Sequence, residues 1–423
     1  MSVPAEVTAL AEGSDHLFPC FSRADVSFTQ GDGAWLHGAD GGRYLDFATG
    51  IAVTGLGHSH PELVDVLVRQ GMKLWHVSNA VRIPEQEELA GLLCEKTFAD
   101  RIFFNNSGAE AIETAIKTAR RHQFVSGSPA RYRIVTFEGG FHGRTLATIA
   151  AGGRPKYLEG FGPPTAGFDT VPFGDLDALA RACTATTAAV LLEPIQGESG
   201  IRSMSAHDLE RVREICDRQG VLLILDEVQT GIGRTGHFFA YQATSVAPDI
   251  LAAAKGLGNG FPVAACLATE KVAAGMTPGT HGSTFGGNPL AMAVASKVVR
   301  LVGNEAFLAD VRRKGERLRA GLEALAAEYS EAFAEVRGEG LLLGLRCVPP
   351  VAVVATAARA NGLLSVVAGD NVLRLLPPLI ISDAEIEEGL MRLRQVGRAI
   401  RRRRAENGDL SLLRPPDLEG PGR

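Results

Sequence analysis

The sequence predicts an α/β protein with a mostly parallel central sheet and a second, smaller lobe. The middle of the chain alternates short apolar runs with stretches of helical periodicity, and the runs are rich in Val, Ile and Leu with little polar alternation. Strands that are buried on both faces have this composition, as in a parallel sheet covered by helices. A chain of 423 residues, 45% of them hydrophobic, is long enough for such a core and an added lobe.

The central elements follow from these runs in order. The strand candidates are "RIFFNN" (101–106), "RYRIVTFE" (131–138), "AAVLLEP" (188–194), "VLLILDEV" (221–228) and "DILAAA" (249–254). A helical pattern over 109–122 follows the first, and another over 205–220 ends at Gly220, a typical helix stop. We therefore expect one large ligand-binding domain over residues 59–302.

The two flanks differ from the centre. The stretch "GAWLHGADGGRYLDFATG" (33–50) predicts a hairpin, and 301–329 predicts a long amphipathic helix. Short strand-like pieces follow, "LLLGLRC" (341–347) and "NVLRLLPP" (371–378). We expect a small α+β domain built from both chain ends, 1–58 and 303–405, and a Pro/Gly-rich tail over 406–423. The four arginines at 401–404 fit the end of a helix better than a site for an anionic partner.

Composition limits the classes of partner. A net charge of -5 argues against a general nucleic-acid binder. The six cysteines form no C-x-x-C pair, which favours reduced thiols over a disulfide framework or a zinc site. His58 and His60 have no third ligand at a useful spacing, so we expect no metal. No apolar run approaches the ~18 residues of a membrane span, and the N-terminus lacks the pattern of a signal peptide. The expectation is a soluble, cytoplasmic protein with no membrane partner.

The first candidate site is the motif "NSGAEA" at the start of the 109–122 helix. Ligands of open α/β sheets bind beyond the carboxyl ends of the strands. Ser107, Gly108 and Ala109 are small, so their N–H groups could approach an anion at the positive end of the helix dipole. The same letters fit a capping box between Ser107 and Glu110. Taken alone, the motif favours the cap.

Two nucleotide-binding motifs are incomplete. The apolar run that ends in Asp226 resembles the metal-holding strand of P-loop nucleotidases, but "EGGFHGRT" has Glu138 and Arg144 where the phosphate loop needs Gly and Lys. The formal G-x-G-x-x-G over 231–236 is not followed by the long helix of a dinucleotide fold. Both interpretations are disfavoured.

The remaining pair is Asp226 and Lys255, each at the end of a buried strand. A buried lysine loses its proton more readily than a solvated one, and a desolvated amine can form a Schiff base with an aldehyde. Pyridoxal phosphate needs a lysine for its aldehyde, a carboxylate for its pyridinium nitrogen and an anion site for its phosphate. The small residues around Lys255 leave room for a flat ring. The three sites together favour this cofactor.

With these residues assembled, the sequence resembles the class III pyridoxal-phosphate aminotransferases, of the aspartate-aminotransferase fold type (fold type I). The resemblance extends from "LFPCFSRADVSF" to "SDAEIEEGL", which is nearly the whole chain. Its motifs are "GIAVTGLGHSHP", "KLWHVSN", "FFNNSGAEA", "FHGRT", "EPIQGE", "LDEVQTGIGRTG", "GTHGSTFGGNPLA" and "NVLRLLPPLI". Within the class they are most similar to the branch that acts on N-acetylornithine.

The resemblance implies a set of cofactor contacts. Lys255 would hold the cofactor covalently and move the proton, and Asp226 would pair with the pyridinium nitrogen. The other implied contacts are the ring (Val228, Phe141), the phenolic oxygen (Gln229) and the phosphate (Ser107, Gly108, Ala109). Thr284, with Ser283 beside it, would reach the phosphate from a neighbouring subunit, which implies a homodimer with shared active sites.

The resemblance also implies how carboxylates are bound. Arg144 would hold the carboxylate far from the reacting amine, and Arg374 the α-carboxylate of glutamate. Glu198 would pair with Arg374 when no α-carboxylate is present, because an unpaired buried guanidinium is costly. Taken one at a time, such arginines are more often part of structural ion pairs.

Three segments depart from the pattern of the branch. Ala80 and Val81 stand where a leucine and an aromatic residue are usual, Thr54 replaces a frequent asparagine, and Ser199 replaces a glycine. The first two segments are expected near the substrate entrance, so they bear on the acyl group that the site accepts.

The expected reaction is transfer of the terminal amine of N-acetylornithine to 2-oxoglutarate, as used in arginine biosynthesis. The alternatives are a related ω-aminotransferase acting on ornithine, succinylornithine or 4-aminobutyrate, and an aminomutase or racemase with the same cofactor. A non-catalytic protein on this fold would require a broken catalytic set, and the set is intact.

Overall fold

A computed structural model describes residues 16–406, and a seven-stranded sheet lies at its centre. The strand order is β4-β12-β11-β10-β7-β5-β6. The strands are β4 (Arg101–Asn105), β5 (Arg133–Phe137), β6 (Phe168–Val171), β7 (Thr187–Leu192), β10 (Leu222–Asp226), β11 (Ile250–Ala253) and β12 (Ala264–Ala268). Each strand predicted from the apolar runs is present, which confirms the class of the central domain.

One strand of this sheet runs against the others. β12 pairs antiparallel with both β11 and β4, whereas β11, β10, β7, β5 and β6 are mutually parallel. The chain therefore returns from the end of β11 by a short connection, residues 254–263, at the same edge of the sheet. That connection contains Lys255.

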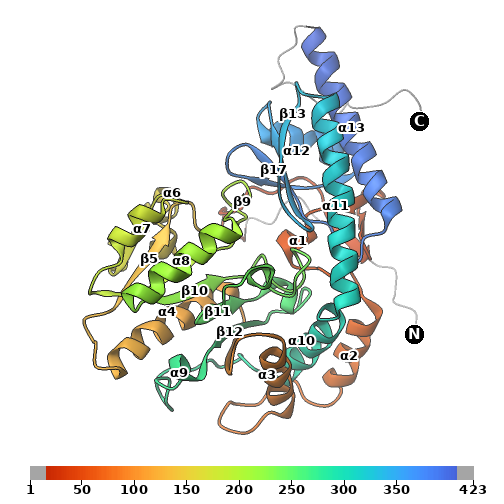
Figure 1. Cartoon of the computed structure of the whole chain (residues 1–423). Coiled ribbons are helices and arrows are strands. Elements are labelled where there is room, and N and C mark those ends of the chain that lie inside the picture. Colours follow the sequence, from red (N-terminus) through yellow and green to blue (C-terminus); the bar gives the residue numbers. More distant parts are fainter. Residues whose placement is uncertain (1–15, 407–423) are drawn as a thin grey trace.

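Helices cover both faces of the sheet, as the apolar strands require. Along β10, Leu222 and Ile224 pack with α4 (Gly108–Val125) in one cluster, while Leu223 and Leu225 belong to the main core on the other face. The helices α7 (Leu176–Ala182) and α8 (Ala206–Gln219) pack together beside the sheet (Figure 1). The predicted stop of α8 is confirmed, since Gly220 adopts the left-handed conformation with φ 61°.

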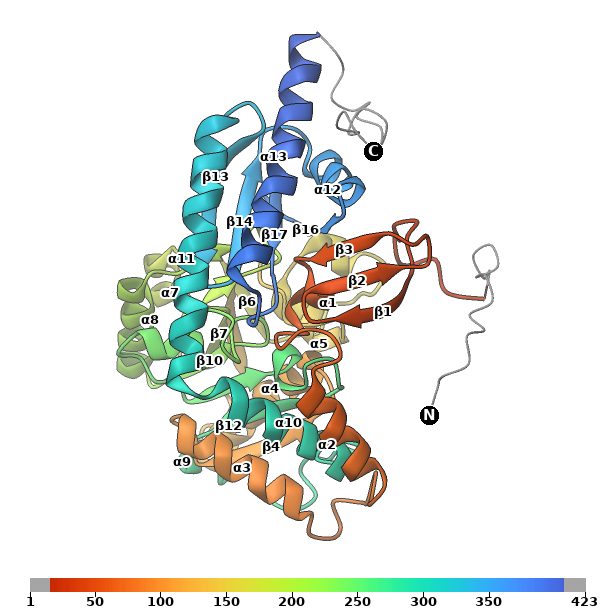
Figure 2. The same ribbon diagram turned by 90° about the vertical axis from the view of Figure 1, so that its right-hand side faces the viewer.

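Further helices complete the body built on this sheet, which we call the lower body. They are α1 (Thr49–Ala52), α2 (Pro61–Gly71), α3 (Pro84–Lys96), α5 (Leu146–Gly152), α6 (Pro155–Leu158), α9 (Glu270–Ala273) and α10 (Pro289–Val302). α10 packs on α2 and α3, so helices that are far apart in the sequence are neighbours in the lower body (Figure 2).

A second body lies above the first (Figure 1). Its sheet has the order β13-β14-β17-β16, made of β13 (Phe333–Glu339), β14 (Leu342–Cys347), β16 (Val366–Ala368) and β17 (Val372–Leu375). Three helices accompany it: α11 (Glu305–Glu328), α12 (Val351–Ala360) and α13 (Asp383–Ala405). The predicted helix over 301–329 is thus divided, because α10 ends at Val302 and Asn304 caps α11.

The first strands of the chain join this second body. β1 (Phe28–Asp32), β2 (Trp35–Gly38) and β3 (Arg43–Asp46) form the predicted hairpin and one further strand, and β15 (Leu363–Leu364) pairs parallel with β3. The two chain ends therefore share one sheet, seen beside α12 in Figure 2. The domain limits 1–58, 59–302 and 303–405 stay a prediction. Most of the predicted tail lies outside the described residues.

The end of α13 carries the four arginines 401–404, in agreement with the predicted helix terminus. Among residues 16–406, no helix is both long enough and apolar enough to cross a membrane.

Candidate active site

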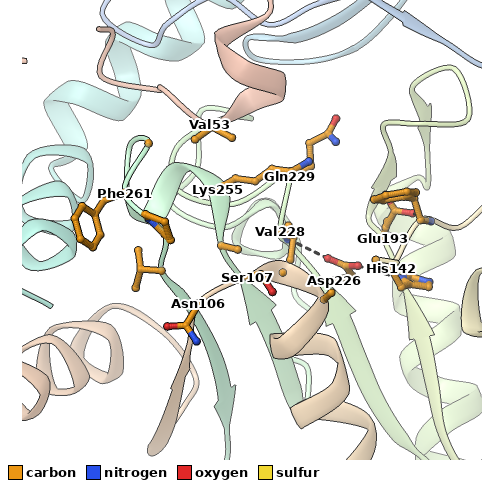
Figure 3. A pocket seen from close by; sticks show the side chains of 18 residues that line it. Val53, Asn106, Ser107, His142, Glu193, Asp226, Val228, Gln229, Lys255 and Phe261 are labelled. Atoms are coloured by element: carbon orange, nitrogen blue, oxygen red, sulfur yellow. Dashed lines mark hydrogen bonds and ion pairs between the residues drawn. The ribbon is translucent and has the colours of Figure 1, made fainter. Parts of the chain in front are cut away.

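A cavity of about 290 Å³ lies at the carboxyl ends of β10 and β11, against the first turn of α4. Figure 3 shows its walls, in which Val228 and Ser107 lie between Lys255 and a group formed by Asp226, His142 and Glu193. The lining residues are Val53, Asn106, Ser107, Gly108, Ala109, Phe141, His142, Gly143, Glu193, Asp226, Val228, Gln229, Ala254, Lys255, Gly260, Phe261, Pro262 and Val263. This is the edge of the sheet at which ligands of parallel α/β proteins bind.

Lys255 begins the short connection between β11 and β12. Its backbone is left-handed, with φ 46°, a conformation that is costly for a residue with a Cβ. The side chain is half-buried in the cavity wall. Burial and the charge of Arg374 lower the pKa of Lys255 to about 8, although nearby carboxylates oppose the change. An amine in this state is far more often neutral at physiological pH than an exposed lysine.

Asp226 ends β10 and is held by two hydrogen bonds. The Val228 N–H donates to Oδ1 at 3.0 Å, and His142 Nδ1 lies 2.8 Å from Oδ2. Both side chains of the Asp226–His142 pair are almost fully buried. Burial alone would lower the pKa of His142, but the hydrogen bond and the charges of Asp226 and Glu193 raise it above its usual range. The imidazole thus favours the charged state and fixes the carboxylate.

Glu193 completes this buried group at the end of β7. Its Oε1 accepts the Phe141 N–H at 2.7 Å, which orients the segment that carries Phe141 and His142. Burial raises the pKa of Glu193, and the charge of Asp226 acts in the same direction. Two acids and one imidazole therefore lie together in one part of the cavity wall.

Glu227 points away from the cavity and serves the scaffold. It accepts the N–H groups of Ala240 at 2.6 Å and Tyr241 at 2.9 Å, and the Thr230 hydroxyl at 2.9 Å. Burial raises the pKa of Glu227 to about 7 in spite of these bonds. These contacts tie the segment after β10 to a later turn and so fix Val228 and Gln229.

The first turn of α4 combines both roles that the sequence suggested. Ser107 Oγ accepts the Glu110 N–H at 3.3 Å, and the Glu110 carboxylate accepts the Asn106 N–H at 2.9 Å, so the helix is capped. The N–H groups of Gly108 and Ala109 have no acceptor within the helix and lie in the cavity wall. A cap made by side chains thus coexists with two backbone donors that an anion can use.

Val228 and Phe141 form part of the cavity wall. A Cβ at Gly108 would lie 2.8 Å from Val228 Cγ1, so Val228 can pack there only because residue 108 is glycine. Phe141 stands in the wall as well, with its N–H fixed by Glu193. The cavity wall therefore includes an aliphatic and an aromatic side chain, of the kinds that can pack on the faces of a planar ring.

Arg374 of β17 extends from the upper body toward the cavity. Its Nη1 donates to Glu198 Oε1 at 2.7 Å and to Gln229 Oε1 at 3.0 Å, and its Nε is buried without a partner. The Arg374 side chain is 1% exposed and that of Glu198 22% exposed. Gln229, predicted to contact the cofactor, therefore also contacts Arg374.

Arg144 and the segment of Thr284 lie outside the cavity wall. The Arg144 guanidinium stacks over the Tyr157 ring at 3.9 Å and has no carboxylate partner among residues 16–406. Ser283 Oγ accepts the Gly286 N–H at 2.9 Å and lies 3.4 Å from Asn106 Nδ2, whereas Thr284 is exposed. The single chain leaves both Arg144 and Thr284 accessible.

The residues present fit pyridoxal phosphate. A lysine with a lowered pKa, a buried carboxylate and two free backbone donors face one cavity. In the described part of the chain, no group of His, Cys, Asp or Glu side chains has the arrangement of a metal site.

Sequence reasoning missed two members of the buried group, His142 and Glu193. Glu193 ends the run "AAVLLEP", so the rule that led to Asp226 points to it equally. His142 lies inside "FHGRT", but no local signal places it 2.8 Å from a residue 84 positions later. Val53 and the 260–263 segment were missed because they belong to connections rather than to strands.

Comparisons with known proteins agree with this geometry. Residues 21–396 match the family described as aminotransferase class-III. A protein from Mesorhizobium japonicum named acetylornithine aminotransferase is 58% identical over 378 residues, which are 89% of this chain and 95% of that protein.

Two solved structures of aminotransferases have a similar fold. The N-acetylornithine aminotransferase from Stenotrophomonas maltophilia has a TM-score of 0.79 and 40% identity, covering 90% of this chain and 97% of its own. The ornithine aminotransferase from Toxoplasma gondii has a TM-score of 0.88 and 32% identity, over 92% of this chain and 94% of its own. That crystal contains PLP at partial occupancy in the active site.

Proposed function

Because this chain belongs to the class-III aminotransferases, we propose that it transfers the terminal amine of N2-acetyl-L-ornithine to 2-oxoglutarate. The products are N-acetyl-L-glutamate 5-semialdehyde and L-glutamate, and the reverse flow serves arginine biosynthesis. The observation that carries the proposal is one cavity that joins Lys255, Asp226 and the α4 N-terminus, in a chain 58% identical to a named acetylornithine aminotransferase.

The cofactor is pyridoxal phosphate, which when bound supplies an electron sink for the carbon that carries the reacting amine. We assign its phosphate to the N–H groups of Gly108 and Ala109, with Ser107 beside them. Val228 and Phe141 would bound the ring, and Gln229 lies within reach of its edge. Asp226, fixed by His142, would keep the ring nitrogen protonated.

Lys255 would carry the proton during the reaction. Its pKa of about 8 means that the amine can accept and release a proton near neutral pH, as an efficient acid–base catalyst must. Its position at the start of a turn, with small neighbours, lets the amine move within the cavity.

Two arginines would let the same site bind a substrate with two carboxylates in one half-reaction and a substrate with one carboxylate in the other. Arg144 would bind the carboxylate remote from the reacting amine, and Arg374 the α-carboxylate of glutamate or 2-oxoglutarate. When N-acetylornithine presents a plain chain near the lysine, Glu198 would neutralise Arg374, which the 2.7 Å contact between them supports.

We further propose that two copies of the chain complete each site. Thr284 is exposed, and several large apolar side chains near this face are exposed too, namely Met72, Leu74, Trp75, Val81 and Phe285. A second copy would cover them and deliver Thr284 to the phosphate. Mixing two inactive variants, Lys255→Ala and Thr284→Asp, would then restore part of the activity, because some mixed dimers contain one intact site. Lack of any restoration would contradict a shared site.

A cytoplasmic location is part of the same proposal. All six cysteines are free thiols, which suits a reducing compartment. Four of them are buried, namely Cys183, Cys216, Cys266 and Cys347.

A panel of amine donors tests the substrate. We expect kcat/KM for N-acetylornithine to exceed that for ornithine, succinylornithine and 4-aminobutyrate, with 2-oxoglutarate as acceptor. A higher value for another donor would reassign the substrate within the family. Product formation without any oxo-acid acceptor would indicate an aminomutase instead.

A further inference from the structure

The turn that carries Glu198 is held by both bodies of the molecule. This turn joins β8 (Ile195–Gln196) to β9 (Arg202–Ser203). The Gly369 N–H donates to the Glu198 carbonyl at 3.0 Å, and Arg337 Nη1 donates to the Gly200 carbonyl at 3.2 Å. Because these bonds fix the backbone of the turn, it is the side chain of Glu198 that must move when a substrate carboxylate replaces it on Arg374.

Ser199, where the family resemblance predicts a glycine, links this turn to Arg154. Its hydroxyl accepts from Arg154 Nη2 at 2.6 Å and lies 2.6 Å from the Gly139 carbonyl, to which it can donate. Arg154 Nε donates to the Gly140 carbonyl at 3.1 Å, and its Nη2 also contacts the Gly139 carbonyl. The guanidinium is thereby clamped between the 139–140 segment and the turn. A glycine at position 199 would remove both side-chain bonds.

Arg154 and Glu198 face a common groove between the two bodies. This open cavity of about 940 Å³ is polar, and its charged lining residues are Arg154, Glu198, Arg202, Arg319, Glu335, Arg337 and Asp370. Burial would raise the pKa of Glu198, but the charges of Arg374, Lys255 and Arg154 together hold it below its usual range. The Glu198 carboxylate is therefore within the field of Arg154, and both side chains line the same groove.

The other arginines of the groove are already engaged. Arg337 pairs with Asp370 at 2.6 Å and with Glu335, and Arg319 pairs with Glu323 at 3.6 Å. Arg202 stacks on the Phe173 ring at 4.3 Å. Arg154 has no carboxylate partner among residues 16–406, since its hydrogen bonds all go to neutral oxygens.

We propose that Arg154, held in place by Ser199, receives the Glu198 carboxylate when a substrate α-carboxylate occupies Arg374. The inference rests on the proposed function, in which glutamate and 2-oxoglutarate bring that carboxylate. Arg154 touches neither substrate nor cofactor and is a positioning residue. It stabilises the displaced Glu198, which would otherwise lose its ion pair with Arg374 without gaining another. Arg154 thus favours the glutamate state of the site over the N-acetylornithine state.

Single-turnover half-reactions of the holoenzyme test this inference through the absorbance of the cofactor. In Arg154→Gln we expect kcat/KM for glutamate to fall about tenfold, chiefly through a higher KM, since one engaged ion pair corresponds to roughly that factor. The N-acetylornithine half-reaction should lose much less, because Glu198 then stays on Arg374. Ser199→Gly should change the ratio in the same direction by about threefold.

A double-variant cycle separates positioning from a general structural role. In a Glu198→Gln background no carboxylate needs a new partner, so adding Arg154→Gln should leave the glutamate half-reaction nearly unchanged. Arg319→Gln is the matched control, because it removes an arginine from the same groove that is engaged elsewhere. It should leave the ratio of the two half-reactions unaltered.

The outcomes are distinct. Equal losses in both half-reactions, or an undiminished effect of Arg154→Gln beside Glu198→Gln, would overturn the role of Arg154 while leaving the transaminase intact. A wild-type protein that reacts with neither donor would instead overturn the proposed function.

Discussion

The cofactor floor and the carboxylate switch are built in opposite ways. The floor, defined by Lys255, Asp226 and His142, lies at the carboxyl edge of one sheet, where Asp226 ends β10 and the other two lie in the connections that follow β11 and β5. The switch, defined by Glu198, Arg374 and Gln229, joins a turn of the lower body to a strand of the upper body. In the proposed reaction the floor residues act in the same way in both half-reactions. The switch residues act differently, because glutamate brings an α-carboxylate to Arg374 and N-acetylornithine does not.

The largest effect is expected from Lys255→Ala, which removes the one amine of the floor. We expect kcat to fall by about 10⁴, at the upper end for loss of an acid–base group. Borohydride treatment of the wild-type holoenzyme should leave a pyridoxyl group on the Lys255 peptide by mass spectrometry, and none should form there in the variant. A Lys271→Ala variant, on the exposed α9, controls for general effects. Substantial activity in Lys255→Ala would refute the floor as the catalytic region.

Asp226→Asn tests the second part of the floor. The change keeps the shape but removes the charge beside His142, and breaking a buried pair costs about 3–5 kcal/mol. We expect kcat to fall by roughly 10² to 10³ for both substrates alike, because the floor serves both. Steady-state kinetics with each donor measure this. A loss confined to one donor would mean that Asp226 belongs to the switch.

Arg374→Gln should instead separate the two substrates. Glutamate loses a charge-assisted contact to its α-carboxylate, worth about 2–3 kcal/mol, so its kcat/KM should fall roughly 30- to 160-fold. N-acetylornithine needs no such contact, and its kcat/KM should change far less. The ratio of the two half-reactions is the measurement. Parallel losses would show that floor and switch are one unit.

The smallest effect is the pH dependence of the floor. Removal from water lowers the pKa of Lys255 from 10.5 to about 8. The rate at which cofactor-free protein captures pyridoxal phosphate should therefore be half-maximal near pH 8. Between pH 8 and 10.5 the unfolded chain binds more protons than the folded one, so this lysine also makes the cofactor-free protein more stable as pH rises. Thermal unfolding across that window should show the increase, and Lys255→Met should abolish it.

The floor could be predicted from the chain alone to a greater extent than the switch. Asp226 and Lys255 end apolar runs, and the rule that ligands lie at strand ends brings them together. The strand β12 was missed because its residues, Ala264 to Ala268, are mostly alanines with weak strand preference. Its reversed direction cannot be read from composition.

The switch was inferred only through family resemblance. Glu198 and Arg374 are 176 positions apart, and no periodicity joins a turn to a distant strand. The sequence marked Ser199 as an unusual residue but gave no reason for it. In the folded structure its hydroxyl accepts a hydrogen bond at 2.6 Å from the guanidinium of Arg154, 45 positions earlier in the chain.

The adjacent acids Asp226 and Glu227 have a practical consequence for protein engineering. Successive residues at a strand end face opposite sides, so Asp226 lines the cavity and Glu227 anchors the loop that follows. Transplanting Asp226 into another scaffold without its neighbour would leave Val228 and Gln229 unsupported. A graft should therefore take the dipeptide together with the receiving turn at 240–241 as its smallest transferable part.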